Sequence, residues 1–407
     1  MLSRRLHTPE GTSDLLQREA YRLRKVRNDV MQVFSGYGYT EVTTPEIEYY
    51  DVFEGGQGLL TQEKMIKFFD RDGRILVLRP DLTTPLARLT ATKLDGKIQK
   101  LCYSGKVFRN FQGGIRPCET SQAGIELIGL RGAEADAEVI AASIRSMLAC
   151  GLKEFQIEIG QVEIFKELME QTGLDPEMTE QIRVFIDQKN IFGVQELLNH
   201  CDIPAEQAEL ILQMPSLYGG SEILEQAEKL TTGKRAEAAI KNLREVYTIL
   251  EEYGLSEYVS LDLAMVQSLD YYTGIIFKGF ARGVGFEVCA GGRYDSLMSR
   301  FGQDCPATGA ALYLDLLNDA LFRQGVVIEA EGIGALVCGT DSKTARKLAE
   351  QLRNSGVRTE YYLGDEDPYL YAKEKGIPAL YRCNEKGISK CDMVSGKEQL
   401  TEGGMFA

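Results

Sequence analysis

The sequence predicts an α+β protein that has an antiparallel sheet core, a helical insertion in that core, and a small C-terminal α/β domain. Strand-like runs lie on both sides of a long stretch, about 162–258, that is rich in Glu, Lys, Leu and Ala at helical spacing. A short linker-like segment, 325–332, then precedes a βαβ pattern. We therefore expect a core over 1–325 and a second domain over 332–407. This agrees with the two to three domains suggested by a length of 407 residues, at roughly 150 residues per domain.

Local patterns predict the elements of the core in order. Apolar residues recur at helical spacing over 15–35, and the glycines that follow end this helix. A turn, Asp70-Arg71-Asp72-Gly73, joins two β-rich runs into a hairpin. The other expected elements before the insertion are strand 39–45, helix 85–93, strands 100–109 and 119–129 around loop 110–117, helix 133–150 and strand 154–160.

Strand patterns return after the insertion. The expected strands are 259–263, 274–280 and 285–289, and a helix is expected over about 309–324. In the C-terminal domain we expect strand 335–338, helix 342–355, strand 357–363, helix 368–375 and strand 379–383.

Composition narrows the classes of function. The formal net charge is −14, which lowers the expectation of a nucleic-acid partner, because phosphate binding needs clustered Lys and Arg. Two histidines exclude most mechanisms built on several histidines. The nine scattered cysteines form no C-x-x-C pair, so we expect reduced thiols and no metal site. We find neither a signal-peptide pattern nor an apolar run of about 18 residues, and we expect a cytoplasmic protein without a membrane partner.

Five motifs occur in a characteristic order and resemble those of histidyl-tRNA synthetase, a class II aminoacyl-tRNA synthetase. The motifs are GYGYTEVTTPEIE at 36–48, LRPDLT at 78–83, YSGKVFR…QAGIE at 103–126, SLDYYTG at 268–274 and AGGRYD at 290–295. The resemblance covers about 8–320 and is loose in the C-terminal domain. It implies the class II fold and a dimer, with Pro45 at the interface.

The resemblance also implies a pocket for histidine as a ligand. Asp81 can pair with the ammonium group of a free amino acid, and Thr83 and Gln122 can complete its hydrogen bonds. Glu126, with Tyr271 or Tyr272, offers an acceptor and a hydroxyl for the two ring nitrogens. Arg109, at the end of the second synthetase motif, belongs to the same predicted set. The alternative for Gln122 and Glu126 is that they only share one face of a strand.

The cations needed to activate ATP are missing from this pattern. The family has an arginine just before its Gly-Leu-Asp-Tyr-Tyr segment, where this chain has Gln267, and a second arginine where this chain has Leu316. The family also has an acidic residue two positions after the arginine that Arg109 matches. Here Asn110 and Phe111 follow Arg109, so Phe111 stands in the place of that acid. Loss of one such arginine can slow phosphoryl chemistry by on the order of 10³-fold, so we expect no adenylation and no catalytic residue.

A synthetase-like scaffold with a surviving pocket resembles the regulatory subunit of the short-form ATP phosphoribosyltransferase. That resemblance implies a non-catalytic subunit required for the first step of histidine biosynthesis, with L-histidine as its effector. It also implies a hetero-octamer with the short catalytic subunit, and no cofactor. Two alternatives stay open: an active histidyl-tRNA synthetase, and another synthetase-derived module.

Overall fold

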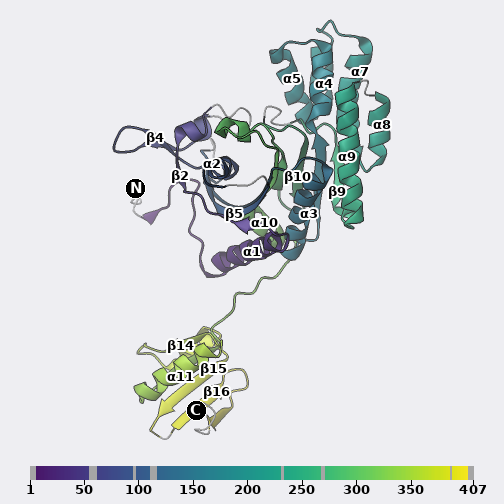
Figure 1. Ribbon diagram of the computed structural model, residues 1–407. Helices are drawn as coiled ribbons and strands as arrows, with labels where there is room; N and C mark the ends of the chain where they lie inside the picture. Colours follow the sequence, from purple (N-terminus) through teal and green to yellow (C-terminus); the bar gives the residue numbers. More distant parts are fainter. Residues whose placement is uncertain are drawn as a thin grey trace. The chain divides into compact units, whose positions relative to one another are not determined.

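The computed structural model describes residues 6–54, 62–94, 98–110, 117–230, 233–266, 271–385 and 387–401. The chain divides into two compact units, Met1–Ile328 and Glu329–Ala407, each of which has its own core (Figure 1). Among the described residues, no helix combines the length and the apolar character that crossing a membrane requires.

The first unit is built on one large sheet. In its described part, the strand order is β1-β5-β6-β12-β11-β10-β7-β9-β8. The bounds are β1 Thr40–Glu41, β5 Gln99–Phe108, β6 Glu119–Ile128, β7 Phe155–Gln161, β8 Tyr218–Gly219, β9 Val259–Asp262, β10 Ile275–Ala281, β11 Glu287–Arg293 and β12 Ala307–Tyr313. Neighbours pair antiparallel except β1 with β5 and β7 with β9. The predicted antiparallel core of an α+β fold is confirmed.

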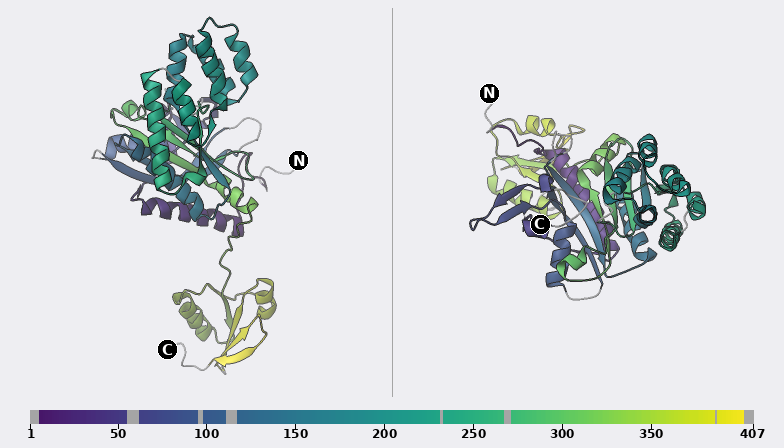
Figure 2. Two further views of the ribbon diagram at one scale, coloured as in Figure 1. Left: turned by 90° about the vertical axis from the view of Figure 1, so that its right-hand side faces the viewer. Right: turned by 90° about the horizontal axis from the view of Figure 1, so that it is seen from above.

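Four helices cover one face of this sheet with apolar side chains: α1 Gln17–Gly36, α3 Ala133–Ala149, α9 Lys234–Glu252 and α10 Leu314–Arg323. In α1, the buried Val26, Val30 and Phe34 recur every four residues, so one stripe of the helix faces the core. Figures 1 and 2 show α3 between α1 and α9, in agreement with their contacts. The opposite face of the sheet carries helix α2, Thr83–Lys93, and a second apolar cluster that includes Leu86, Tyr103 and Ile128.

The remaining elements of the first unit are a small sheet and the helical insertion. The small sheet has the order β2-β4-β3, with β2 Ile47–Tyr49, β3 Lys67–Phe69 and β4 Ile75–Leu78. Its β3–β4 pair is the hairpin predicted from the turn at Asp70–Gly73. The insertion contains α4 Val162–Thr172, α5 Pro176–Asp187, α6 Ile191–Leu198, α7 Ala205–Gln213 and α8 Glu222–Leu230 and leads into α9. Figure 1 shows these helices as one bundle beside the sheet.

The helix expected over 309–324 is wrong over its first five residues, 309–313. Ala307–Tyr313 is strand β12, and helix α10 begins only at Leu314. Local composition does not distinguish a helix from a strand in a short run rich in Ala and Leu. Hydrogen bonding to β6 on one side and β11 on the other decides it here. The strand expected over 39–45 is also shorter, because only Thr40–Glu41 pairs with β5.

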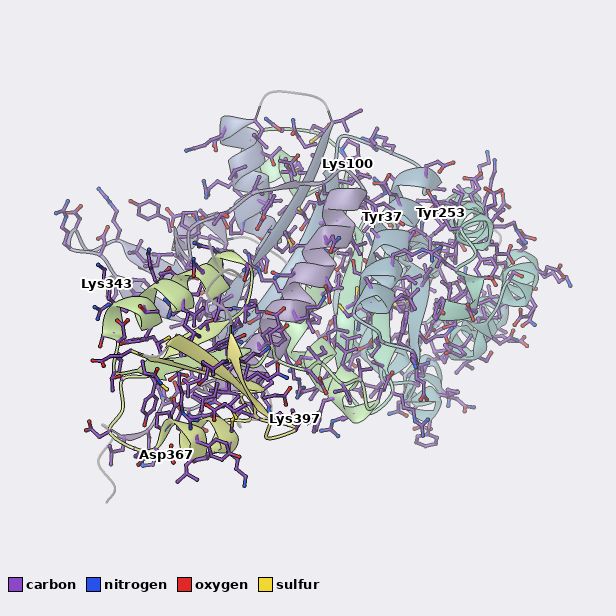
Figure 3. All side chains as sticks on the ribbon, turned by 90° about the horizontal axis from the view of Figure 1, so that it is seen from below. Tyr37, Lys100, Tyr253, Lys343, Asp367 and Lys397 are labelled. Carbon is purple, nitrogen blue, oxygen red and sulfur yellow. The ribbon has the colours of Figure 1, made fainter. Side chains whose placement is uncertain are left out.

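The second unit is a small α/β domain with the predicted βαβ order. Its strands, in the order β14-β13-β15-β16-β17, are β13 Ala335–Gly339, β14 Thr359–Tyr361, β15 Ala379–Asn384, β16 Gly387–Asp392 and β17 Glu398–Thr401, and its helices are α11 Ser342–Asn354 and α12 Pro368–Glu374. The first three strands are parallel, whereas β16 and β17, which were not predicted, add antiparallel. Asp367, labelled in Figure 3, caps α12 by accepting the Tyr369 N–H at 2.9 Å.

Candidate functional site

A polar cavity lies on the face of the large sheet opposite the four-helix layer, beside β6. Ile125 and Leu127 point into the helix-covered core, so the alternation of a strand directs Gln122 and Glu126 to the other face. The cavity has a volume of about 160 Å³. All seven residues predicted to bind a ligand line it: Asp81, Thr83, Arg109, Gln122, Glu126, Tyr271 and Tyr272. The structure therefore brings the predicted set together in one place.

Glu126 is the most buried charged group of this cavity, with 1% of its surface exposed. Its Oε1 accepts hydrogen bonds from Thr83 Oγ1 at 2.7 Å and from Tyr103 OH at 3.3 Å. Its Oε2 accepts a hydrogen bond from the hydroxyl of Tyr294. Burial raises the pKa of Glu126 to about 8, although these three hydroxyl donors favour the ionised form. The group can therefore gain or lose a proton near neutral pH.

Asp81 places a second carboxyl group at the start of α2. Its Oδ1 accepts the Thr84 N–H at 2.7 Å, and its Oδ2 accepts the Thr84 hydroxyl at 3.2 Å. Burial raises the pKa of Asp81, and the hydrogen bonds from Thr84 partly oppose that effect. When ionised, two carboxyl groups around one small cavity attract a cationic ligand, and such a ligand in turn favours their ionised forms. Arg109 lies at the edge, where its Nε donates to the Pro80 carbonyl at 2.7 Å.

Three tyrosine rings form the aromatic wall. Tyr271 and Tyr272 meet edge to face, with ring centroids 4.9 Å apart. Tyr271 also stacks on Tyr294 at 5.5 Å, with 23° between the rings. Because Tyr294 bonds to Glu126, the wall and the buried carboxyl group form one continuous structure. Such contacts orient flat rings and leave hydroxyl groups to bind polar atoms.

Tyr103 and Tyr294 also belong to the site but were not predicted from the sequence. Tyr103 faces the cavity side because β5 pairs with β6, and its register partner Gly124 leaves room for the ring. Gly309 on β12 does the same for Glu126, since an added Cβ would overlap the carboxyl group. A tyrosine directly after the AGGR segment was the available signal for Tyr294. The pairing of Tyr103 with a glycine required the register.

A second cavity of about 380 Å³ adjoins the first and shares Arg109 and Tyr313 with it. Leu316, which stands at a position where the synthetases have an arginine, lines this second cavity together with Val284 and Phe286. Gln267, the other position of this kind, lies outside the described residues. Within the described ranges, no cluster of three or more His, Cys, Asp or Glu side chains could hold a metal ion.

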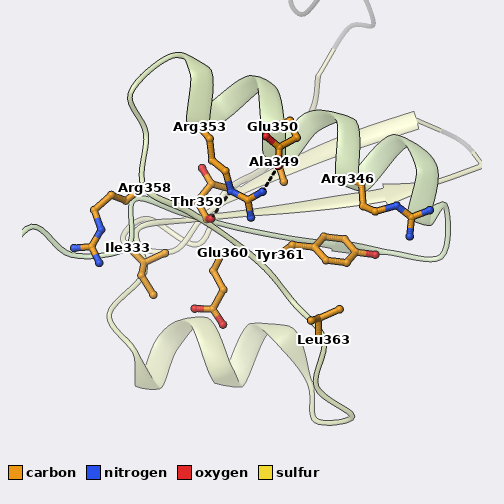
Figure 4. A pocket seen from close by; sticks show the side chains of 10 residues that line it. All are labelled: Ile333, Arg346, Ala349, Glu350, Arg353, Arg358, Thr359, Glu360, Tyr361 and Leu363. Atoms are coloured by element: carbon orange, nitrogen blue, oxygen red, sulfur yellow. Dashed lines mark hydrogen bonds and ion pairs between the residues drawn. The ribbon is translucent and has the colours of Figure 1, made fainter. Parts of the chain in front are cut away.

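The C-terminal unit has a cavity of its own, between α11 and the edge strand β14 (Figure 4). It is larger, about 730 Å³, and contains none of the predicted site residues. Arg353 lies across it, where its Nε donates to the Thr359 carbonyl at 3.1 Å and its guanidinium pairs with Glu350. The bond to Thr359 ties α11 to the sheet edge, whereas the pair with Glu350 lies within α11. Both contacts are accounted for by packing of the domain.

Comparison with known proteins agrees with this architecture. The family model for histidyl-tRNA synthetase matches residues 11–317. A solved structure described as an ATP phosphoribosyltransferase regulatory subunit/histidyl-tRNA synthetase from Bacillus halodurans is 30% identical, with a TM-score of 0.85 over 93% of this chain and 98% of that chain. A histidyl-tRNA synthetase from Nostoc sp. shares the fold, with 21% identity and a TM-score of 0.81 over 97% and 96% of the two chains. The fold and the pocket define a class II synthetase-like protein of the histidyl-tRNA synthetase type.

Similarity to one curated relative identifies a narrower family within this class. The ATP phosphoribosyltransferase regulatory subunit of Acetivibrio thermocellus is 46% identical over 386 residues, which cover 93% of this chain and 92% of the relative. The chain belongs to the family of ATP phosphoribosyltransferase regulatory subunits. The family predicted from the sequence motifs is confirmed.

Proposed function

We propose that this chain is a non-catalytic subunit that binds histidine in the polar cavity and regulates a separate catalytic ATP phosphoribosyltransferase chain in histidine biosynthesis. One observation supports the proposal above the others: the seven residues predicted to bind histidine line one small polar cavity, and Leu316 lines the adjoining cavity at a position where the synthetases have an arginine. The names of the curated relatives agree with this role.

The chemistry of the cavity suits histidine. The carboxyl group of Asp81 complements an ammonium group, and the side-chain amide of Gln122 can bind the same end of the ligand. Glu126 and a tyrosine hydroxyl complement the two nitrogens of an imidazole. An apolar amino acid would offer no hydrogen-bond donor to the buried Glu126 and would gain none of this interaction. Histidine is therefore preferred over apolar amino acids of similar size.

Regulation follows from linkage between the ligand and the assembly. Histidine can shift the catalytic partner between states only by the difference in its affinity for those states, typically 1–3 kcal/mol. We propose a hetero-octamer of regulatory and short catalytic chains in the cytoplasm. Within it, the regulatory chains pair as dimers through the face of β2, where Ile47 and Tyr49 are 48% and 49% exposed.

The test is to co-express this chain with the short catalytic subunit, purify the complex, and measure phosphoribosyl transfer with and without this chain and histidine. We expect activity to depend on this chain and to fall with histidine. Histidine-dependent exchange of pyrophosphate into ATP by this chain alone would instead identify an active synthetase. Failure of the two chains to co-purify, with no effect on activity, would overturn the proposal.

A further inference from the structure

The helical insertion contacts the chain at two described positions, one just before and one just after 267–270, and the second of these lines the cavity. Lys166 on α4 donates from Nζ to the carbonyl of Tyr272 at 2.9 Å. Arg183 on α5 donates from Nη1 to the carbonyl of Val266 at 3.3 Å. Both donors come from the insertion, and both acceptors belong to the segment that leads to the aromatic wall. The insertion and the cavity are thus physically connected.

One face of α4 makes several of these contacts. Val162 and Lys166 are four residues apart and therefore lie on the same side of the helix. Val162 packs with Met265 and Ile276 in a small buried cluster against which Tyr272 lies. The backbone N–H of Val162 also donates to the Gly274 carbonyl at 3.1 Å. The ring of Tyr272, its carbonyl and the carbonyl two residues later all rest on the first turns of α4.

The ammonium group of Lys166 also forms an ion pair with an acidic side chain of α4. Glu163 Oε1 lies 3.1 Å from Lys166 Nζ, and Glu163 Oε2 lies 3.2 Å from Arg235 Nε on α9. Helix α9 packs in the main core with α3. An ion pair on one side and a carbonyl on the other restrict where the ammonium group can lie. Lys166 therefore has a defined position relative to both the core and Tyr272.

We propose that Lys166 is a positioning residue for the ligand cavity. It fixes Tyr272, whose edge-to-face contact orients Tyr271; Tyr271 in turn stacks on Tyr294, which holds Glu126. Lys166 does not line the cavity, so its effect on the ligand passes through these rings. The identity of the ligand as histidine rests on the function proposed above. The positioning role itself rests on the contacts of α4.

The experiment compares Lys166→Met, Lys166→Arg and Lys241→Met in the full chain by calorimetric titration with histidine. Lys241 is a matched control, because its side chain on α9 is 78% exposed. We expect Lys166→Met to weaken histidine binding by about tenfold, the effect of losing one charged hydrogen bond. We expect Lys166→Arg to retain most of the affinity and Lys241→Met to bind like the parent. Equal affinity of Lys166→Met and the parent would overturn the proposal.

A second readout separates this proposal from the proposed function. Hydrogen exchange of the amides around Tyr272–Ile275 is measured without ligand, alongside thermal unfolding to confirm that each variant folds. Faster exchange in Lys166→Met, with no change in Lys241→Met, supports the positioning role even if the parent does not bind histidine. If a folded Lys166→Met variant does not bind the ligand but its amides exchange as fast as those of the parent, the positioning role is wrong. Absence of histidine binding by the parent overturns only the proposed ligand.

Discussion

The two adjoining cavities of the core share Arg109 and Tyr313 but differ in the chemistry around them. The smaller one encloses the carboxyl groups of Asp81 and Glu126 within tyrosine and threonine hydroxyl groups. In the larger one, Leu316 stands with apolar neighbours, and the acids Asp315 and Asp319 accompany the cations Arg109 and Arg323. A mixture of acids and cations is poorly suited to stabilise a polyphosphate, which requires an excess of positive charge. This difference between the cavities supports the proposal that the chain binds an amino acid without activating it.

Among the substitutions that test the difference between the two cavities, we expect Glu126→Gln to change histidine affinity the most. Above roughly pH 8, where Glu126 is mainly ionised, the substitution removes a charge that accepts hydrogen bonds from three hydroxyl groups and, as proposed, from the ligand. We expect about a 100-fold loss of histidine affinity in calorimetric titration, equivalent to about 3 kcal/mol. Glu154→Gln is the control, since Glu154 pairs with Arg282 at the surface. An unchanged affinity of Glu126→Gln would move the histidine site out of the smaller cavity.

Gly309→Ala is expected to have the next largest effect. The added methyl group would overlap the carboxyl group of Glu126, so the strand or the side chain must shift. Overpacking of this kind costs about 2 kcal/mol, which corresponds to roughly 30-fold weaker histidine binding or an equal loss of stability. Urea unfolding and titration together measure both parts. Gly36→Ala, where an added Cβ meets no atom, should change neither quantity.

We expect the affinity for histidine to depend on pH through the ionisation of Glu126. Its pKa is raised to about 8, so below that pH the ligand must displace a proton to gain a carboxylate. We expect histidine affinity to rise about tenfold between roughly pH 7 and pH 8.5, as ionised Glu126 becomes the main form. Glu126→Gln should bind weakly at every pH in this range. A slope that persists in Glu126→Gln would assign the titration to another group.

Stability should change with pH in the opposite direction. A carboxyl group whose folded pKa is raised from 4.5 to about 8 keeps a proton that the unfolded chain releases. The folded state therefore loses stability as the pH rises from 4.5 to about 8 and loses no more above that value. We expect the melting temperature of Glu126→Gln, relative to the parent, to rise across this range. A constant difference between the two proteins would contradict the raised pKa.

The smallest effect is expected for Leu316→Arg. Leu316 lines the larger cavity and not the smaller one, so histidine affinity should stay within about twofold of the parent in titration. We also expect no histidine-dependent pyrophosphate exchange, because Gln267 still occupies the other arginine position. Activity restored by this one substitution would show that the larger cavity is closer to a working adenylation site than its lining suggests.

Sequence patterns predicted the elements whose local signals agree with their packing. The apolar stripe of α1, the hairpin at Asp70–Gly73 and the βαβ order of the second unit are examples. Sequence patterns failed at Ala307–Tyr313. The composition of this segment suits a helix, but its pairing with two strands makes it strand β12. The spacing of Gln122 and Glu126 predicted that they share a face, but it did not reveal that Tyr103 and Tyr294 complete that face.

The sequence by itself determined the chemical types available at the site, namely two carboxyl groups, several hydroxyl groups and a leucine in place of an arginine. Those residue types are fixed by the chain, and no folding step changes them. Only the tertiary structure decided that Asp81, Glu126 and Tyr271 line one cavity, because α2, β6 and the segment before β10 are far apart in sequence. It also decided the raised pKa of Glu126, since loss of water around a carboxyl group depends on what packs against it.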